Sequence, residues 1–188
     1  PLSRYIATAT KAHGAESFRR MSGPVVELPE RMNAAALLVD ANVEAGRGGK
    51  IAIYDVADSS TFTYCDVLEM TNRTGNALRE LGVRMEERVM LLLPDSPAFV
   101  FSFFGAIKIG AVPIPTNTLL RAPDYEYMLN DSRARVLLVS QALLEHIEPI
   151  RDRLRHLRQI VVVGGLRGEC GHLLAYDELV NASSPALD

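Results

Sequence analysis

The glycine pairs of this chain are the residues best suited to bind a phosphate, and neither pair has the required spacing. Gly49 and Lys50 form the one Gly-Lys pair of the sequence. A phosphate-binding loop of the form GxxxxGK[ST] would also need a glycine at position 44 and a hydroxyl residue at position 51, where the chain has glutamate and isoleucine. Gly164 and Gly165 follow the apolar run IVVV without GxGxxG spacing, so they indicate a turn at the end of a strand.

Cysteine and histidine are too dispersed in this sequence to predict a metal site or a covalent mechanism. His172 follows Cys170 by two residues, but no second pair stands at zinc spacing. No GxSxG elbow occurs, and Cys65 falls in an amphipathic stretch, where we expect it to pack against the protein. His146 and His156 lie among charged residues and are expected on the solvated surface. We therefore predict no catalytic residue and no metal ligand.

The composition is that of a globular α/β body rather than a nucleic-acid-binding or membrane-spanning chain. Of the 188 residues, 48% are hydrophobic, and 20 Lys and Arg are outnumbered by 23 Asp and Glu with the two signs mixed, which excludes a basic stripe for nucleic acid. The longest apolar run, residues 99–109, is interrupted by Ser102 and Lys108, whereas a membrane span needs roughly 20 apolar residues. The two cysteines are too few for a disulfide framework, so we expect free thiols and a cytoplasmic protein.

The amino-terminal part divides into a tail and two local elements. Residues 1–23 are basic, poor in acids and without a strand or helix period, which predicts a flexible tail, with a transit peptide as the alternative. From Asn33, a capping residue, a helix is predicted that ends at Gly46. Its inward face is expected to carry four apolar residues: Leu37, Leu38, Ala41 and Ala45. Residues 51–54 and 61–63, separated by the turn sequence DVADSS, predict a small β-hairpin.

The next helix has both of its ends encoded locally. Thr63 and Asp66 have the spacing of a capping box, with aspartate in place of the usual glutamate, and Gly82 provides a stop. Strands alternate with helices from there on, which predicts right-handed crossovers and a mostly parallel, doubly wound sheet of Rossmann or flavodoxin type with helices on both faces. The predicted strands are 88–93, 111–115, 135–139 and 159–163, and the predicted helices are 97–109, 123–130, 143–154 with an interruption at Pro149, and 176–180, after which residues 183–188 are expected to fray.

The first helix of the sheet region is apolar on nearly every side, so we expect it to be buried between layers, with its phenylalanines in the core. A parallel sheet binds ligands beyond the carboxyl ends of its strands. Four segments follow those ends and are the predicted ligand positions: Pro94–Ser96, Thr116–Leu120, Ser140 and Gly164–Leu166.

The order of these pieces resembles the adenylate-forming, AMP-dependent acyl-CoA synthetases, most closely the amino-terminal part of a benzoate-CoA ligase. The resemblance covers residues 28–188. It rests on the blocks NAAALLVDANVEAGRGGKIAIYD, TYCDVLEMTNRTGNALRELGV, ERVMLLLPDSPAFVFSFFGAIKIGAVPIPTNTLLRAPDYEYMLNDSRARVLLVS, VVVGG and AYDELVNASSP, in this order. The resemblance implies that residues 24–188 form the amino-terminal subdomain of a larger ligase domain.

The resemblance also implies an activity and its cofactors. ATP and a carboxylic acid would give an acyl-adenylate and pyrophosphate, and coenzyme A would then displace AMP to give a thioester. In the family the Gly/Ser/Thr-rich phosphate loop, the acidic residues for magnesium and the catalytic lysine come after the stretch that resembles this chain. We therefore expect the parent protein to use ATP, Mg²⁺ and CoA, and the 188 residues alone to bind none of them and to be inactive.

One site residue is carried over from the resemblance. In some relatives a basic residue in the loop after the strand AVPIP approaches a phosphate of CoA. This sequence has Leu119 at the nearest matching place and Arg121 two positions later, so Arg121 is the candidate, and an exposed arginine at a helix start is the alternative.

Two further alternatives concern the function itself. One is a free-standing, flavodoxin-like binding or regulatory module, for which 188 residues would suffice. The other keeps the superfamily and changes the acid to a fatty acid, a coumarate-like acid or an amino acid. If the chain is part of a ligase, the remainder of that chain is its partner, and apolar surface left uncovered predicts self-association of the isolated piece.

Overall fold

A computed structural model describes residues 30–166 and 172–187 of the chain. Its contacts divide the chain into two units, Pro1–Glu30 and Arg31–Asp188. The helices and strands of the described residues all belong to the second unit. The predicted tail, residues 1–23, and Cys170 lie outside the described residues.

The hairpin and the helix after it form as their sequence predicts. Strands β1 (Ile51–Tyr54) and β2 (Thr61–Thr63) pair antiparallel and lead directly into helix α2 (Tyr64–Glu80). The amide of Asp66 donates to Thr63 Oγ1 at 3.2 Å, and the amide of Thr63 donates to Asp66 Oδ2 at 2.8 Å, which completes the capping box. Gly82, with a φ of 81°, closes the other end of the helix.

Five parallel strands form the main sheet, in the spatial order β4-β3-β5-β6-β7. They are β3 (Arg88–Leu92), β4 (Val112–Pro115), β5 (Val136–Ser140), β6 (Gln159–Val163) and β7 (Leu173–Ala175), and every neighbouring pair is parallel. This is the strand order of the flavodoxin-like class. The predicted fold class is confirmed, whereas β7 was not predicted.

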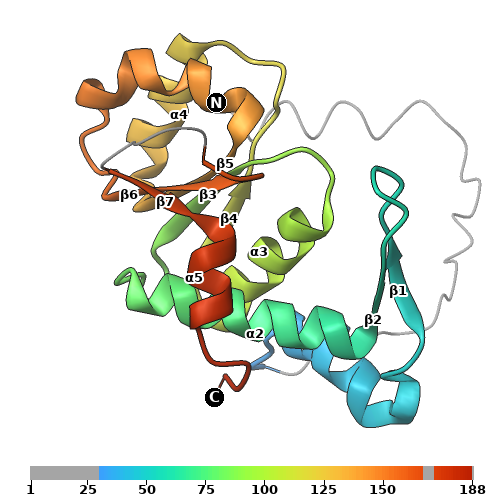
Figure 1. The fold of residues 1–188 in the computed structure, drawn as a ribbon. Helices are drawn as coiled ribbons and strands as arrows, with labels where there is room; N and C mark the ends of the chain where they lie inside the picture. Colours follow the sequence, from blue (N-terminus) through green and yellow to red (C-terminus); the bar gives the residue numbers. More distant parts are fainter. Residues whose placement is uncertain (1–29, 167–171, 188) are drawn as a thin grey trace, which may run out of the picture. The chain divides into compact units, whose positions relative to one another are not determined.

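Helices cover both faces of this sheet (Figure 1). On one face, α2, α3 (Pro97–Lys108) and α5 (Tyr176–Ala182) pack on alternate strand residues such as Leu91 and Leu138. On the other face, α4 (Ala122–Ser132) and the 3₁₀ helices η3 (Gln141–His146) and η4 (Glu148–Arg153) pack on Met90 and Leu137. The alternation buries both faces of the strands, as the continuous apolar runs of the sequence require.

Helix α3 lies against α2 with the two backbones unusually close. A Cβ added at Gly105 would lie 3.0 Å from the amide nitrogen of Gly75 and from the carbonyl oxygen of Thr71. Ser96 caps the helix by accepting from the amide of Phe99 at 3.3 Å, as predicted. No residue of α3 is fully exposed, which agrees with its apolar composition.

The first helical segment has a different inward face from the predicted one. It contains two π-helical stretches, η1 (Ala36–Asp40) and η2 (Val43–Arg47), whose i→i+5 bonds widen the turn, so 3.6-residue spacing no longer selects the buried side. Val39 is buried at 2% exposure, whereas Leu37 and Leu38 are 52% and 55% exposed and Ala45 is also exposed. The prediction of Leu37, Leu38 and Ala45 as inward residues is wrong.

Two further expectations are wrong for local reasons. Cys65 is exposed rather than packed, because it lies in the first turn of α2 on the side that faces water. Residues 183–187 do not fray, because side chains of α2 hold their backbone by hydrogen bonds. The predicted helix 143–154 is interrupted, but the break lies at Ile147 and Pro149 is the second residue of the piece that follows. The two pieces are the 3₁₀ helices η3 and η4 rather than α-helix.

Candidate functional site at the carboxyl edge of the sheet

The loops predicted to bind a ligand meet at one edge of the sheet because all five strands run parallel. Pro94–Ser96, Thr116–Leu120 and Gly164–Leu166 follow β3, β4 and β6, and Ser140 is the last residue of β5. From β3 the chain crosses first to β4 on one side and then to β5 on the other. The strand order therefore reverses at β3 and β5, and the crevice outside their carboxyl ends is where open α/β sheets place their ligands.

The loop after β4 is held in one conformation by its neighbours. The amide of Thr116 donates to the carbonyl of Leu91 at 3.0 Å, which keeps the loop in line with β3. The amide of Leu119 donates to Asn117 Oδ1 at 2.9 Å, and the hydroxyl of Tyr125 donates to the carbonyl of Asn117 at 3.0 Å. Tyr125 is fully buried, and burial raises its pKa, so it remains a neutral donor at physiological pH.

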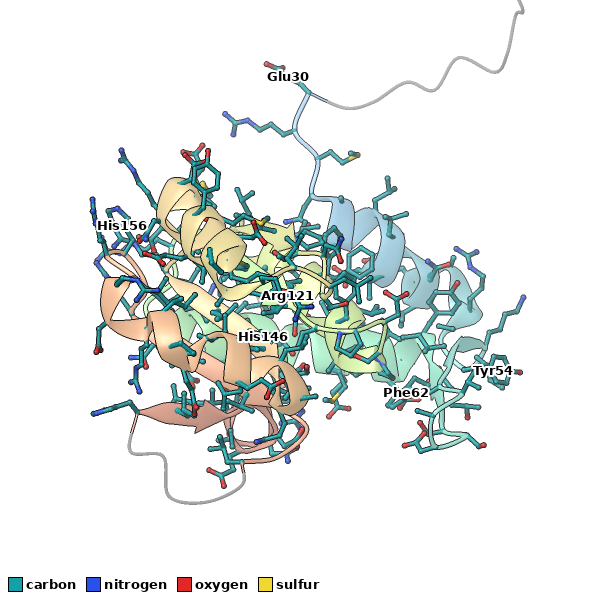
Figure 2. The ribbon with its side chains drawn as sticks, turned by 90° about the horizontal axis from the view of Figure 1, so that it is seen from above. Glu30, Tyr54, Phe62, Arg121, His146 and His156 are labelled. Carbon is teal, nitrogen blue, oxygen red and sulfur yellow. The ribbon has the colours of Figure 1, made fainter. Side chains whose placement is uncertain are left out.

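Arg121 stands at the end of this loop, where α4 begins (Figure 2). Its amide donates to Asp124 Oδ2 at 3.1 Å, and its carbonyl accepts from the amide of Asp124 at 2.9 Å, so the backbone of Arg121 is fixed by the helix start. Its side chain is exposed, and within residues 30–166 and 172–187 no ion pair involves its guanidinium. The structure thus gives this edge a cation on a rigid backbone that is open to solvent. Leu119, the nearest match to the basic residue of some relatives, is 85% exposed and apolar.

The segment after β5 contributes two residues that the sequence did not single out as part of this edge. The ring of His146 lies 6.3 Å from that of Tyr125, centroid to centroid, and is half-buried. His156 is also half-buried, so both histidines are less solvated than predicted. Oε1 of Gln141 is buried without a hydrogen-bond partner among the described residues. Neither residue belongs to a motif. Gln141 could have been indicated only by its position directly after β5, and His146, which ends η3, had no such signal.

Gly164 and Gly165 end β6 with φ values of 94° and 85°. Both values lie in the left-handed region, which side chains other than glycine rarely adopt, so the pair is explained by the turn. A Cβ at Gly164 would be 3.9 Å from the Cβ of Gln141, which leaves the glycine in ordinary contact with the segment after β5. The expectation of a turn at the end of a strand is in keeping with this geometry.

The described part of the edge does not fit ATP or a metal ion. Within the described ranges no three His, Cys, Asp or Glu side chains gather to hold a metal ion. Four charged or titratable residues stand in the segments after β3, β4 and β5: Asp95 and Arg121 in loops, and Glu145 and His146 at the end of η3. No glycine-rich cradle accompanies them among the described residues. This edge can therefore form a wall of a site and provide one cation, while the groups that cradle nucleotide phosphates are not among these residues.

Comparison with known proteins gives the family of the chain. The sequence pattern of the family described as "AMP-binding enzyme" matches residues 39–185. The chain belongs to this family. The match includes every strand of the sheet and all four carboxyl-edge segments, so the candidate site lies wholly within the AMP-binding enzyme sequence.

Similar proteins of the AMP-binding family include several aryl-CoA ligases. Over 143 residues the chain is 46% identical to the benzoate-CoA ligase of Thauera aromatica, and the aligned region covers 76% of this chain and 27% of that protein. Over 132 residues it is 45% identical to the 4-hydroxybenzoate-CoA/benzoate-CoA ligase of Rhodopseudomonas palustris, covering 70% of this chain and 24% of that protein. The chain thus spans about a quarter of the length of these relatives.

A solved structure confirms the fold of the chain. The anthranilate CoA ligase AuaEII, crystallised with anthranoyl-AMP, superposes with a TM-score of 0.79 at 40% identity, over 86% of this chain and 30% of that one. The resemblance to the amino-terminal part of an aryl-CoA ligase is confirmed. No helix of the described residues is long and apolar enough to cross a membrane.

Proposed function

We propose that this chain is the amino-terminal portion of an ATP-dependent aryl acid:CoA ligase. The observation that carries the proposal is the 46% identity to a benzoate-CoA ligase over 143 residues. Two features of the structure support it: the parallel sheet of the aryl-CoA ligase fold, and a carboxyl edge that offers a wall and one cation but no phosphate cradle among the described residues. A free-standing binding module is not favoured, because the family match extends over residues 39–185.

The proposed reaction has two balanced steps. The carboxylate attacks the α-phosphorus of ATP, forming an acyl-adenylate and releasing pyrophosphate. The thiol of CoA then attacks the acyl carbon, forming the thioester, and AMP leaves while the thiol proton is released. The ATP phosphates and Mg²⁺ would be held by residues outside this chain, so the 188 residues alone should show neither step.

The first experiment is an assay of two proteins. One is the 188-residue chain, and the other carries these residues within a chain of the relatives' full length, taken from the coding sequence on either side. With benzoate, ATP, Mg²⁺ and CoA, the longer protein should release AMP and pyrophosphate and form benzoyl-CoA, and the 188-residue chain should not. A panel with fatty, coumarate-like and amino acids identifies the acid. The proposal would be contradicted if the longer protein formed AMP only with a fatty acid or an amino acid, or with no acid of the panel.

Arg121 is proposed to contact a phosphate of CoA in the longer protein. The support is its exposed guanidinium, its fixed backbone and its position in the loop after β4. In the full-length ligase, Arg121→Ala should raise KM for CoA about fivefold, the effect of one exposed charge-assisted contact of about 1 kcal/mol. Adenylate formation, followed without CoA by trapping with hydroxylamine, should be unchanged.

A matched control separates a contact with CoA from a general effect of charge. Arg84 is also exposed, but it precedes β3 and so lies toward the amino ends of the strands. Arg84→Ala should leave KM for CoA unchanged. An equal rise in both variants, or no rise in Arg121→Ala, would remove the proposed role of Arg121.

The compartment and the partners follow from the same proposal. An aryl-CoA ligase that uses ATP and CoA works where both are abundant, and we therefore propose a cytoplasmic protein. The exposed thiol of Cys65 is compatible with a reducing compartment. The proposed partner of residues 31–188 is the remainder of the ligase chain, together with the aryl acid, ATP and CoA.

A further inference from the structure

One face of α2 binds the backbone of the segment that follows α5 (Figure 1). We call residues 183–187 the clasped segment. Nδ2 of Asn76 donates to two of its carbonyl oxygens, both at 2.8 Å, Nδ2 of Asn72 donates to a third at 2.8 Å, and Nη1 of Arg73 donates to a fourth at 2.7 Å. The acceptors, in chain order, are the carbonyls of Ser183, Ser184, Pro185 and Ala186. Four consecutive carbonyls are thus bound by side chains from adjacent turns of one helix.

The same face has a socket for one apolar side chain. A Cβ added at Gly75 would lie 2.6 Å from Cδ2 of Leu187, so the absence of a side chain at Gly75 makes room for the leucine. Leu187 also packs against the core cluster beneath α2 and α5. Gly75 lies between Asn72 and Asn76, and the socket is therefore part of the donor face.

The clasped segment is complementary to this face in its hydrogen-bonding groups. Pro185 has no backbone N–H, the amide of Ala186 donates to Ser184 Oγ at 3.1 Å, and the amide of Ser183 donates to the carbonyl of Leu179 at 3.1 Å. The segment therefore offers mainly acceptors, and the face of α2 offers donors. Because the recognised atoms belong to the backbone, the complementarity depends on a segment that turns four consecutive carbonyl groups toward α2 and places a leucine at position 187.

The elements before the clasped segment are short, and they are held by one strand pairing and by the apolar side of α5, whose Tyr176 and Val180 are buried in the core. Strand β7 has three residues and pairs with β6 on one side, and α5 has seven residues, too few to be stable by itself. Tyr176, the first residue of α5, makes a hydrogen bond of 2.9 Å with Thr74 of α2. Val180 of α5 and Leu78 of α2 share the same core cluster, and the clasped segment adds four hydrogen bonds through its backbone carbonyls to this apolar contact.

We propose that Asn72, Arg73, Gly75 and Asn76 form a clasp that recognises the carbonyl groups and the leucine of the clasped segment and thereby holds β7 and α5 closed on the sheet. Without the clasp, β7 and α5 open as one local unit while β3 and β5 stay folded. The clasp is separate from the carboxyl-edge site, and its role does not depend on the ligase activity.

Hydrogen exchange of the 188-residue protein, measured residue by residue by NMR, tests the clasp. Asn76→Asp keeps the size of the side chain and removes both donated bonds. The amides of β7 and α5 should exchange about thirtyfold faster in this variant, because two bonds of about 1 kcal/mol each are lost and about 1.4 kcal/mol corresponds to tenfold. The amides of β3 and β5 should keep their wild-type rates. Leu187→Ala, a milder change, should give the same pattern and carries the test if Asn76→Asp does not fold.

Asn130→Asp is the matched control. Nδ2 of Asn130 donates to the carbonyl of Arg153 at 3.1 Å, and Oδ1 accepts from the amide of Arg155 at 2.9 Å, so this variant also loses one donor and keeps its acceptor, on the other face of the sheet. It should leave exchange in β7 and α5 unchanged. Unchanged exchange in β7 and α5 of both clasp variants, or equally faster exchange in β3 and β5, would overturn the proposal.

Discussion

Asn33 joins two helices through one side-chain amide, and replacing that amide with a carboxylate should separate its two roles. Oδ1 accepts from the amides of Ala35 and Ala36, at 3.0 and 3.4 Å, and caps the first helical segment as the sequence predicts. Nδ2 donates to the carbonyls of Ile107 and Lys108, at 3.0 and 3.1 Å, at the end of α3. Asn33→Asp keeps the acceptor and removes the donor.

The magnitude follows from these four bonds. Aspartate and asparagine are equally good N-caps, so the cap itself should lose nothing. Two hydrogen bonds to backbone carbonyls are lost, at about 1 kcal/mol each. The new carboxylate also faces the negative end of the α3 dipole, which adds about 0.3–1 kcal/mol. The free energy of unfolding should therefore fall by about 2–3 kcal/mol.

Urea denaturation at pH 7, followed by circular dichroism, measures this change, and Asn117→Asp is its matched control. Oδ1 of Asn117 accepts from the amide of Leu119 at 2.9 Å, and no donated bond of its Nδ2 is observed within the described ranges. The control should change the free energy of unfolding by less than about 0.5 kcal/mol, as is usual for a surface substitution. A loss below about 1 kcal/mol in Asn33→Asp, or equal losses in the two variants, would refute the view that Asn33 fastens α3.

Three further predictions concern pH, the sheet edge and association. Burial raises the pKa of Tyr176 from 10.0 to about 12, so the unfolded chain loses this proton first, and stability that is complete below pH 10 should fall by up to about 3 kcal/mol by pH 12. Alkaline denaturation should show a shallower decline in Tyr176→Phe. Val112 and Thr116 donate their amides inward to β3, so Pro113 and Pro115 occupy the outward amide positions of the edge strand β4. Replacing both prolines with valine would give this edge free N–H groups and should cause aggregation visible by light scattering. The wild-type chain should self-associate as its concentration rises, because Leu37 and Leu38 are exposed apolar side chains, and the double variant Leu37→Ser, Leu38→Ser should self-associate less. A wild-type monomer at every concentration would contradict this prediction.

The parts of the fold that the sequence predicted are those whose signals are local. Thr63, Asp66 and Gly82 determine both ends of α2 within a few residues, and Ser96 with Pro97 begins α3. The alternation of strands and helices was sufficient for the parallel sheet, and with it for the edge at which the four ligand segments meet.

The features that were missed depend on contacts between distant residues or on helix geometry that apolar spacing does not encode. Strand β7 has three residues and exists because β6 pairs with it, so no period could reveal it. Leu37 and Leu38 have helical spacing, but the π-helical turns move them outward. The clasped segment is held by donors about 110 positions earlier in the chain, and its sequence alone indicates only a loop.

At the candidate site, sequence and structure contribute different things. The ligand segments could be predicted because their positions follow from strand order. The rigidity of the loop after β4 could not be predicted, because it depends on the hydrogen bond that the Tyr125 hydroxyl donates to the carbonyl of Asn117. The buried Oε1 of Gln141 and the contact of His146 with Tyr125 likewise follow from packing after β5.

The central claim is that these residues belong to an aryl acid:CoA ligase, and aryl-acid-dependent pyrophosphate release tests it most directly. A protein of the relatives' full length that contains residues 1–188 should release pyrophosphate when given ATP, Mg²⁺ and benzoate, and should form benzoyl-CoA once CoA is added. The account would be contradicted if a folded full-length protein released no pyrophosphate with any aryl acid, whether or not another class of acid supported the release.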